Sequence, residues 1–229
     1  MIGILGAMDA EVEAIFAQMT SKEKINVNNL TFYKGQLFGK DVVVVKCGIG
    51  KINAALCTQL LILTFKVEKV INTGIAGAVG AGLNQYDFVV STDAVYHDFD
   101  CAFFDYKLGQ LPGLPETFKA DEKMIGTAMD AFQKSALAKE HKITKGLIAS
   151  GDQFIAGGER KDFIVNTFHP ACVEMEGCSI AHTCFVNNVP FVIIRCMSDC
   201  ADENVETNYD EAKAAAISSA FLLDVVKEI

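Results

Sequence analysis

The chain has 229 residues, of which 51% are apolar, and a formal net charge of −9. This length fits one α/β domain with a large core, and the acidity argues against a nucleic-acid surface, which needs clustered lysines and arginines. The uncharged, strongly apolar stretch at residues 52–65 is too short to span a bilayer.

Short β-branched runs alternate with longer helix-like segments along the chain. Strands are predicted at residues 2–5, 42–45, 69–72, 87–96, 146–149 and 191–197, and helices at residues 9–19, 52–65, 121–135, 158–167 and 210–229. This alternation favours an α/β fold with a mainly parallel sheet. No linker, repeat or low-complexity tract interrupts residues 1–229, so we expect a single domain.

The cysteines and histidines indicate neither disulfides nor a metal site. The eight cysteines contain no C-x-x-C pair, and most of them lie in apolar runs, where a free thiol behaves as a small apolar side chain. The four histidines have no metal-ligand spacing. The N-terminus lacks the basic region and the uninterrupted apolar core of a signal peptide. We therefore expect a cytoplasmic protein with reduced cysteines, no metal and no cofactor.

Glycines, hydroxyls and carboxylates gather at the carboxyl ends of six predicted strands. The segments that follow these strands read GAMDAE, KCGIGK, TGIAGAVG, SGDQFI, EMEG and SDCAD. One such glycine loop is more typical of a simple tight turn. Six in succession indicate a shared small-molecule site, because ligands of an open α/β sheet bind at the carboxyl ends of its strands.

The glycine run TGIAGAVGAG, residues 73–82, resembles a dinucleotide-binding fingerprint only loosely. It does not open the first βαβ unit, and no acidic residue follows at the spacing that ribose binding needs. The chain also has no G-x-x-x-x-G-K-[ST] motif. Binding of NAD or of a nucleoside triphosphate is therefore disfavoured.

The segment ACVEMEG, residues 171–177, brings two carboxylates, Glu174 and Glu176, to the end of a strand-like stretch. A carboxylate near a core is costly unless it is paired. Period-two alternation gives the two side chains a shared direction if the strand continues to Glu176. Two interpretations of Glu176 remain at this point, a functional carboxylate or a helix-start residue stabilised by the helix dipole.

Six motifs taken together carry a resemblance to a known family. They are GAMDAEVE near the start, CGIGK at residues 47–51, NTGIAG at 72–77, SGDQFI at 150–155, VEMEG at 173–177 and RCMSDCAD at 195–202. The chain resembles the 5′-methylthioadenosine/S-adenosylhomocysteine nucleosidases of the purine nucleoside phosphorylase superfamily. The resemblance runs from Ile2 to the C-terminal helix, and its most specific part is VEMEG followed by SD-x-AD.

The resemblance implies a single-domain, three-layer, nucleoside phosphorylase-like α/β fold over residues 1–229, with a central mixed, mostly parallel sheet flanked by helices. It also implies irreversible hydrolysis of the N-glycosidic bond of an adenine thio-nucleoside through an oxocarbenium-like transition state. Such a reaction needs an acid that protonates N7 of adenine, a base that activates water, and a carboxylate that binds the ribose diol. The resemblance assigns these roles to Asp199, Glu11 and Glu176.

Further substrate-binding positions follow from the same resemblance. Phe154 is expected to stack on the adenine, and Ile155 to offer backbone groups to its edge. Ser198 is expected to hold Asp199 in its rotamer, and Tyr209 to close the site. The full set of these positions is Met8, Ile49, Ile75, Ala76, Gly77, Phe154, Ile155, Glu174, Met175, Arg195, Ser198 and Tyr209.

The sugar end of the expected site is lined by Met8 and Ile49, and Met175 is expected to lie against the sugar face, where a thioether adapts to an irregular surface. The role of Glu174 stays open between two interpretations. It orients Arg195 and the water network, or it forms a purely structural ion pair with Arg195.

An aromatic loop, CAFFDYKLGQLP at residues 101–112, matches a family loop that reaches into the pocket of a neighbouring subunit. The resemblance therefore implies a homodimer in which Phe104, Tyr106 and Pro112 touch the 5′-substituent of the partner's substrate. Without the resemblance, this loop would read as a core or interface patch.

One position departs from the family. Members often carry Ser where this chain has Ile75, so a hydroxyl that would help to hold the nucleophilic water is absent. The alternative of a phosphorylase needs several guanidiniums for phosphate, but the chain has only Arg160 and Arg195. A non-catalytic nucleoside-binding protein is disfavoured because all three catalytic carboxylates are retained. The sequence leaves open the choice among methylthioadenosine, S-adenosylhomocysteine, 5′-deoxyadenosine and aminodeoxyfutalosine.

Overall fold

The strands and helices alternate along the chain as the sequence pattern predicts. The computed structural model describes residues 1–201 and 209–229. Its strands are β1 (Ile2–Gly6), β2 (Thr20–Val27), β3 (Leu30–Leu37), β4 (Lys40–Lys46), β5 (Lys69–Ala78), β6 (Phe88–Tyr96), β7 (Phe118–Lys119), β8 (Ile143–Ser150), β9 (Cys172–Glu174) and β10 (Phe191–Asp199). Its helices are α1 (Asp9–Gln18), α2 (Lys51–Phe65), α3 (Glu122–Lys134), α4 (Gly158–Phe168), α5 (Gly177–Asn187) and α7 (Glu211–Glu228), with short 3₁₀ turns at Ala102–Phe104 and Ala136–Lys139.

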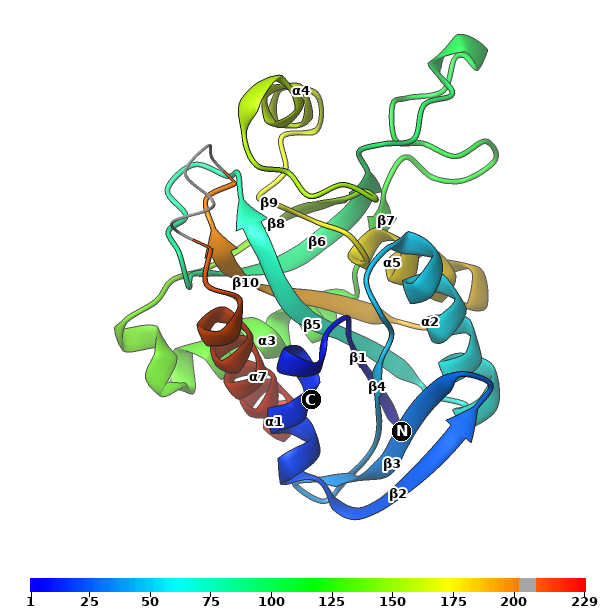
Figure 1. Cartoon of the computed structure of the whole chain (residues 1–229), viewed down its shortest axis with the longest axis vertical. Coiled ribbons are helices and arrows are strands. Elements are labelled where there is room, and N and C mark those ends of the chain that lie inside the picture. The colour runs from blue at the N-terminus through cyan, green and yellow to red at the C-terminus, as the bar shows by residue number, and fades with distance from the viewer. Residues whose placement is uncertain (202–208) are drawn as a thin grey trace.

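All the strands join one mixed sheet in the order β10-β6-β8-β9-β5-β1-β4-β3-β2, with β7 paired to β6 (Figure 1). Its centre, β4-β1-β5-β10, is parallel, whereas β2, β3 and β4 form an antiparallel meander at one edge. β10 also pairs with β5, so β5, β10, β6, β8 and β9 close on themselves like a small barrel. The α/β fold class with a mixed sheet is confirmed.

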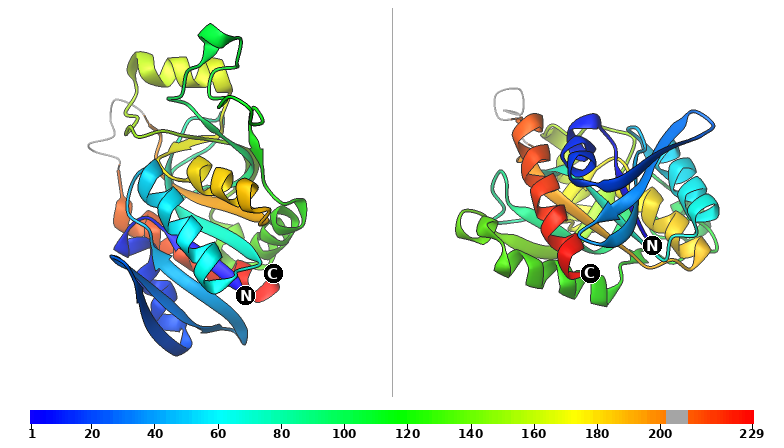
Figure 2. Two further views of the ribbon diagram at one scale, coloured as in Figure 1. Left: turned by 90° about the vertical axis from the view of Figure 1, so that its right-hand side faces the viewer. Right: turned by 90° about the horizontal axis from the view of Figure 1, so that it is seen from below.

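Helices cover the two sides of the sheet and give a three-layer arrangement. α2 and α5 pack against each other on one side, and α1, α3 and α7 lie on the other (Figure 2). The central strands of the sheet between them are mostly apolar and buried, as the run Val42–Val45 in β4 illustrates. Within the described ranges, no helix is long and apolar enough to cross a membrane.

Three elements differ from the sequence prediction. The strand predicted at residues 69–72 continues to Ala78, so the glycine-rich TGIAGA is strand and not loop. Its second half gains partners on both edges, β10 and β9, which a local pattern does not reveal. The hairpin of β2 and β3 was not predicted, because β2 is polar and mostly exposed. The small-residue stretch after Glu176 forms the buried helix α5.

The carboxyl ends of β1, β4, β5, β8, β9 and β10 lie toward the same region of the molecule, where the glycine- and carboxylate-rich segments follow them (Figure 1). β1, β4, β5 and β10 run in one direction and therefore end at one edge. β8 and β9 run against β5, and the closure of the sheet brings their ends to the same region. The fold therefore gathers side chains that are far apart in the sequence.

A test of local stability lies far from this edge. Asp121 caps α3, and its carboxylate accepts hydrogen bonds from the backbone N–H groups of Lys123 (3.0 Å) and Met124 (2.9 Å). Asp121→Ala should lower the free energy of unfolding by about 1 kcal/mol, the usual effect of losing such a cap. The exposed Asp130 of the same helix offers a control, and Asp130→Ala should leave the free energy of unfolding nearly unchanged in urea titrations. Equal effects of the two variants would contradict the capping role.

Candidate active site

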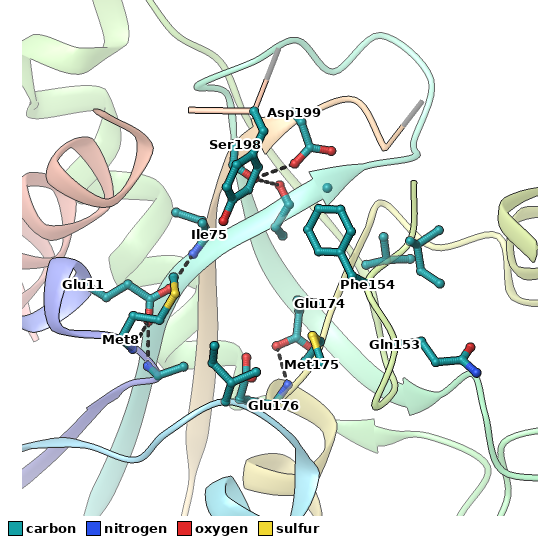
Figure 3. A pocket seen from close by; sticks show the side chains of 17 residues that line it. Met8, Glu11, Ile75, Gln153, Phe154, Glu174, Met175, Glu176, Ser198 and Asp199 are labelled. Carbon is teal, nitrogen blue, oxygen red and sulfur yellow. Dashed lines mark hydrogen bonds between the residues drawn. The ribbon is translucent and has the colours of Figure 1, made fainter. Parts of the chain in front are cut away.

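A pocket that is partly open to solvent lies at the carboxyl edge of the sheet. Figure 3 shows Met8 and Glu11 on one side of it, Met175 and Glu176 below, Asp199 above and Phe154 opposite Glu11. Most of the positions that the sequence assigns to the site line this pocket. They are Met8, Glu11, Ile49, Ile75, Ala76, Gly77, Phe154, Ile155, Glu174, Met175, Glu176, Ser198, Asp199 and Tyr209.

Glu11 lies in the first turn of α1, immediately after β1, and is 2% exposed. Three backbone N–H groups fix its carboxylate: those of Ala7 (2.6 Å) and Met8 (3.0 Å) bond to Oε2, and that of Ile75 (3.0 Å) bonds to Oε1. Burial raises the pKa of Glu11, although the charge of Arg195 and these N–H groups oppose the change. A fixed carboxylate with a raised pKa is well suited to accept a proton from water.

Arg195 is fully buried beneath the pocket in β10 and does not line it. Its Nη2 donates to Glu174 and to Oδ1 of Asn72 (2.8 Å), and it lies 3.6 Å from Oε2 of Glu176. Burial disfavours the charged guanidinium, but the surrounding carboxylates of Glu174, Glu176 and Glu11 outweigh it and raise the pKa of Arg195. Arg195 therefore acts on the pocket through the carboxylates that it holds.

Gly74 in β5 makes room for this arrangement. A Cβ placed on Gly74 would collide with Nη1 of Arg195 and approach Oε1 of Glu11 to 2.5 Å. Both groups thus crowd against the same backbone position, one from β10 and one from α1. A side chain at this glycine would force the guanidinium and the carboxylate of Glu11 apart.

Glu174 and Glu176 occupy different positions in the chain. Glu174 ends β9, whereas Glu176 lies just before α5 as its N-cap residue, so strand alternation does not extend to it. The helix-start interaction belongs to Glu174, whose Oε2 accepts from the backbone N–H groups of Glu176 (3.0 Å) and Gly177 (2.7 Å). The condition for a shared strand direction, a strand that continues to Glu176, is therefore not met, yet both carboxylates face Arg195.

Glu176 is 5% exposed and has one backbone partner, since its Oε1 accepts from the N–H of Gly50 at 2.8 Å. Burial, and next the charge of Glu174, raise the pKa of Glu176 to about 7, while Arg195 opposes the change. Its Oε2 accepts no hydrogen bond from the described residues. The carboxylate thus has an acceptor to spare for a ligand in the pocket.

Asp199 ends β10 at the top of the pocket. Its Oδ2 accepts from the hydroxyl of Ser198 (2.7 Å), and its Oδ1 accepts from the backbone N–H of Ala201 (2.6 Å). Gly77 lies beside it, and a Cβ there would come within 2.9 Å of the Cβ of Ala201. The SD-x-AD motif ends at Asp202, which lies outside the described residues.

Two aromatic rings stand at the open side of the pocket. Phe154, in the loop after β8, and Tyr209, before α7, meet edge to face with ring centroids 5.8 Å apart. Both rings are more than one third exposed, so their apolar surface is available to a flat ligand. Ile155, next to Phe154, is buried and lines the pocket with it.

The aromatic loop of residues 101–112 lies apart from this chain's pocket. It projects away from the body of the protein (Figure 1), and Phe104, Tyr106 and Pro112 do not line the pocket. Phe103 and Phe104 are 91% and 68% exposed. Their apolar rings have no cover in a single chain.

Several contributors to the site were not predicted. Gln153 and Val173 line the pocket, the backbone N–H groups of Ala7 and Gly50 hold carboxylates, and Asn72 holds Arg195. Gln153 and Val173 belong to the SGDQFI and VEMEG motifs, whereas Ala7 and Gly50 act through their backbone N–H groups and Asn72 acts from beneath the pocket. Among the described residues, no group of three or more His, Cys, Asp or Glu side chains is placed to hold a metal ion.

Comparisons with known proteins agree with this geometry. A sequence profile of the Phosphorylase superfamily matches residues 1–227. The 5′-methylthioadenosine/S-adenosylhomocysteine nucleosidase of Actinobacillus succinogenes is 43% identical over 231 aligned positions, which cover 100% of this chain and 99% of the relative.

Solved structures are also similar to this chain over its full length. The nucleosidase of that name from Neisseria meningitidis, in complex with methylthio-immucillin-A, has a TM-score of 0.95 and 37% identity, covering 100% of this chain and 99% of its own. A futalosine hydrolase mutant of Helicobacter pylori has a TM-score of 0.93 and 35% identity, covering 100% and 99%. The chain belongs to the Phosphorylase superfamily and, within it, to the 5′-methylthioadenosine/S-adenosylhomocysteine nucleosidases.

Proposed function

We propose that this protein hydrolyses the N-glycosidic bond of 5′-methylthioadenosine and S-adenosylhomocysteine, and releases adenine and a 5-thioribose. The observation that carries the proposal is the placement of three carboxylates, Glu11, Glu176 and Asp199, around one pocket and in three different environments. Hydrolysis of a riboside needs three separate carboxylate roles, and each environment fits one of them. The whole chain, residues 1–229, would form the catalytic domain.

The adenine would lie between Phe154 and Asp199. An exposed aromatic face supports stacking of a flat base. Asp199 would give a proton to N7 as the bond to C1′ breaks, so that adenine leaves as a neutral molecule. Ser198 and the N–H of Ala201 hold the carboxyl group in place for this transfer.

The ribose would lie over Met175, with its 2′- and 3′-hydroxyls on the free Oε2 of Glu176. The negative charge there also stabilises the positive charge that develops on the ribosyl ring. Glu11, on the other side of the pocket, would take a proton from the attacking water. Ile75 offers no hydroxyl to this water, and its backbone N–H is already used by Glu11, so the water depends on Glu11 itself.

Phosphate is disfavoured as the nucleophile. Arg195 is enclosed by carboxylates, and Arg160 is exposed on α4, where it bonds to Gln153 and does not line the pocket. Three buried carboxylates, Glu11, Glu174 and Glu176, share one guanidinium, so the floor of the pocket would repel a phosphate dianion. This arrangement favours the nucleosidase over a phosphorylase.

Two other adenine nucleosides are candidate substrates besides 5′-methylthioadenosine and S-adenosylhomocysteine. The similarity to a futalosine hydrolase supports aminodeoxyfutalosine as an alternative substrate, and 5′-deoxyadenosine fits the same adenine and ribose contacts. Methionine salvage and recycling of by-products of S-adenosylmethionine would be the physiological role. The free cysteines of the described chain fit the reducing cytoplasm, where we place the protein.

A homodimer would complete the site. Ile52 and Leu56 of α2 are exposed, and a groove joins α2 to Phe99 and to Leu111 of the aromatic loop. A contiguous apolar surface of this kind marks an interface, and closed twofold dimers are the commonest assembly. Across the interface the loop would bring Phe104, Tyr106 and Pro112 to the 5′-substituent.

The first test concerns the nucleophile. Because the pocket floor repels phosphate, adenine release from methylthioadenosine should proceed at full rate in phosphate-free buffer. The measurement is chromatographic quantification of adenine and of the sugar product with and without phosphate. A requirement for phosphate, with ribose 1-phosphate as a product, would show that the chain is a phosphorylase.

The second test separates the acid from the base. Asp199→Asn and Glu11→Gln should each lower kcat by ~10²–10⁴-fold, the usual contribution of a general acid or base. A nitrophenyl riboside leaves without protonation of a purine nitrogen, so it should partly rescue Asp199→Asn but not Glu11→Gln. The comparison uses kcat, because KM also reports binding. Rescue of Glu11→Gln alone, or of both equally, would reverse or refute the assignment.

The third test concerns assembly. Leu56→Glu places a charge on the exposed apolar face of α2 and should convert a dimer into a monomer that has lost most of its activity, because the partner's loop is missing. Light scattering at the assay concentration gives the mass, and Gln18→Glu, on the exposed face of α1, is the matched control. A wild-type monomer with full activity would rule out the shared site.

A further inference from the structure

Glu174 has more contacts than a simple partner of Arg195 would need. Its Oε1 accepts from the hydroxyl of Ser150, and its Oε2 accepts from Arg195 and from the backbone N–H groups of Glu176 and Gly177. The hydroxyl of Ser150 is itself an acceptor for the N–H of Cys178 (2.7 Å), so its hydrogen points to Glu174. Every contact of Glu174 is therefore with a donor, as expected of an ionised carboxylate.

These donors come from separate parts of the fold. Ser150 ends β8, Arg195 lies in β10, and Glu176 and Gly177 begin α5. Glu174 is 7% exposed, and its contacts leave little of its carboxylate for a ligand. It thus joins the strands that carry the pocket to the helix on which Glu176 begins.

The distances around Arg195 show how its charge is shared. Nη2 donates to Glu174 and Asn72 but lies 3.6 Å from Oε2 of Glu176, beyond a hydrogen bond. If Glu174 carried no charge, the guanidinium would have Glu176 as its nearest anionic partner and would be drawn to it. Oε2 of Glu176, which already faces Arg195, would then be drawn from 3.6 Å into a hydrogen bond with the guanidinium and would no longer be available to a ligand.

We propose that Glu174 is a positioning residue, whose negative charge occupies Arg195 and so leaves the carboxylate of Glu176 free to bind the ribose diol. This inference rests on the proposed function, because it assigns Glu176 to the diol. It assigns no substrate contact to Glu174 itself.

The charge of Glu174 also makes Glu176 a stronger acceptor. The charged and titratable groups that face Glu176 are Glu174 from β9, Arg195 from β10, Glu11 from α1 and the buried thiol of Cys47 after β4. Burial and then Glu174 raise the pKa of Glu176 to about 7. Since Glu176 binds the diol as a carboxylate, activity should be lost as the pH falls through this pKa.

The informative variant is Glu174→Gln. The amide oxygen can take the place of Oε2 and keep its donors, while the amide NH₂ faces the hydroxyl of Ser150, which can rotate and accept. The charge is lost while the shape is kept, so the variant should fold. Glu174→Asp keeps the charge but shortens the reach, and Glu13→Gln removes an exposed carboxylate of α1 as the control.

Two readouts are compared across these variants. The first is the titration of Glu176 in the substrate-free enzyme, followed by NMR of ¹³C-labelled glutamate carboxyls and assigned by its loss in Glu176→Gln. The second is the pH dependence of kcat/KM for methylthioadenosine. In Glu174→Gln, Glu176 should titrate about one pH unit or more lower, and the acidic limb of kcat/KM should move in the same direction. Above the limb, kcat/KM should fall by about 10- to 100-fold, because the diol ligand is displaced.

Glu174→Asp should keep the position of the acidic limb while kcat/KM falls, and Glu13→Gln should match the wild type in both readouts. An unmoved titration of Glu176 in Glu174→Gln overturns the proposal, as does a variant that loses stability but keeps the wild-type pH profile and rate. The titration needs no substrate, so it judges Glu174 even if the wild type releases no adenine, a result that would reject the proposed function instead.

Discussion

The elements that line the pocket are arranged around one fully buried guanidinium, that of Arg195. Arg195 lies beneath the pocket with Glu174 in contact and with Glu176 and Glu11 close enough to raise its pKa. Charges so deep in a protein are tolerated only when they are paired and hydrogen-bonded, and removing one partner of such a pair costs about 3–5 kcal/mol. The surrounding elements are therefore held to positions in which all these groups find partners.

The closed ring of strands supplies those positions. β10 pairs with β5 along nearly its whole length, which brings Arg195 beside Gly74, and only a residue without a side chain leaves room there for the guanidinium and for Glu11. The short strand β9 pairs with both β5 and β8, and it delivers Glu174 to the same spot.

The cluster also divides the work among similar side chains. One positive charge among three buried carboxylates cannot satisfy them equally, so their environments differ. Glu174 is saturated by donors, Glu176 keeps a free oxygen and a pKa near 7, and Glu11 is held by three backbone N–H groups. Asp199 lies away from this cluster at the end of β10, bonded to Ser198 and Ala201. Differences in environment, more than in residue type, therefore suit these carboxylates to the separate roles proposed for them.

The sequence by itself determined the α/β class, most of the strands and helices, and most of the residues that line the pocket. Those features are local, because apolar periodicity marks buried elements and the strand-end motifs are short contiguous segments. Tertiary structure decided the rest. β5 extends through TGIAGA because two other strands pair with it, and Arg195 lies beneath the pocket instead of in it. Glu174, and not Glu176, meets the start of α5. Each of these three features depends on partners more than twenty residues away in the chain or on backbone N–H groups. Nearly all residue types carry such N–H groups, so the side-chain pattern does not predict these features.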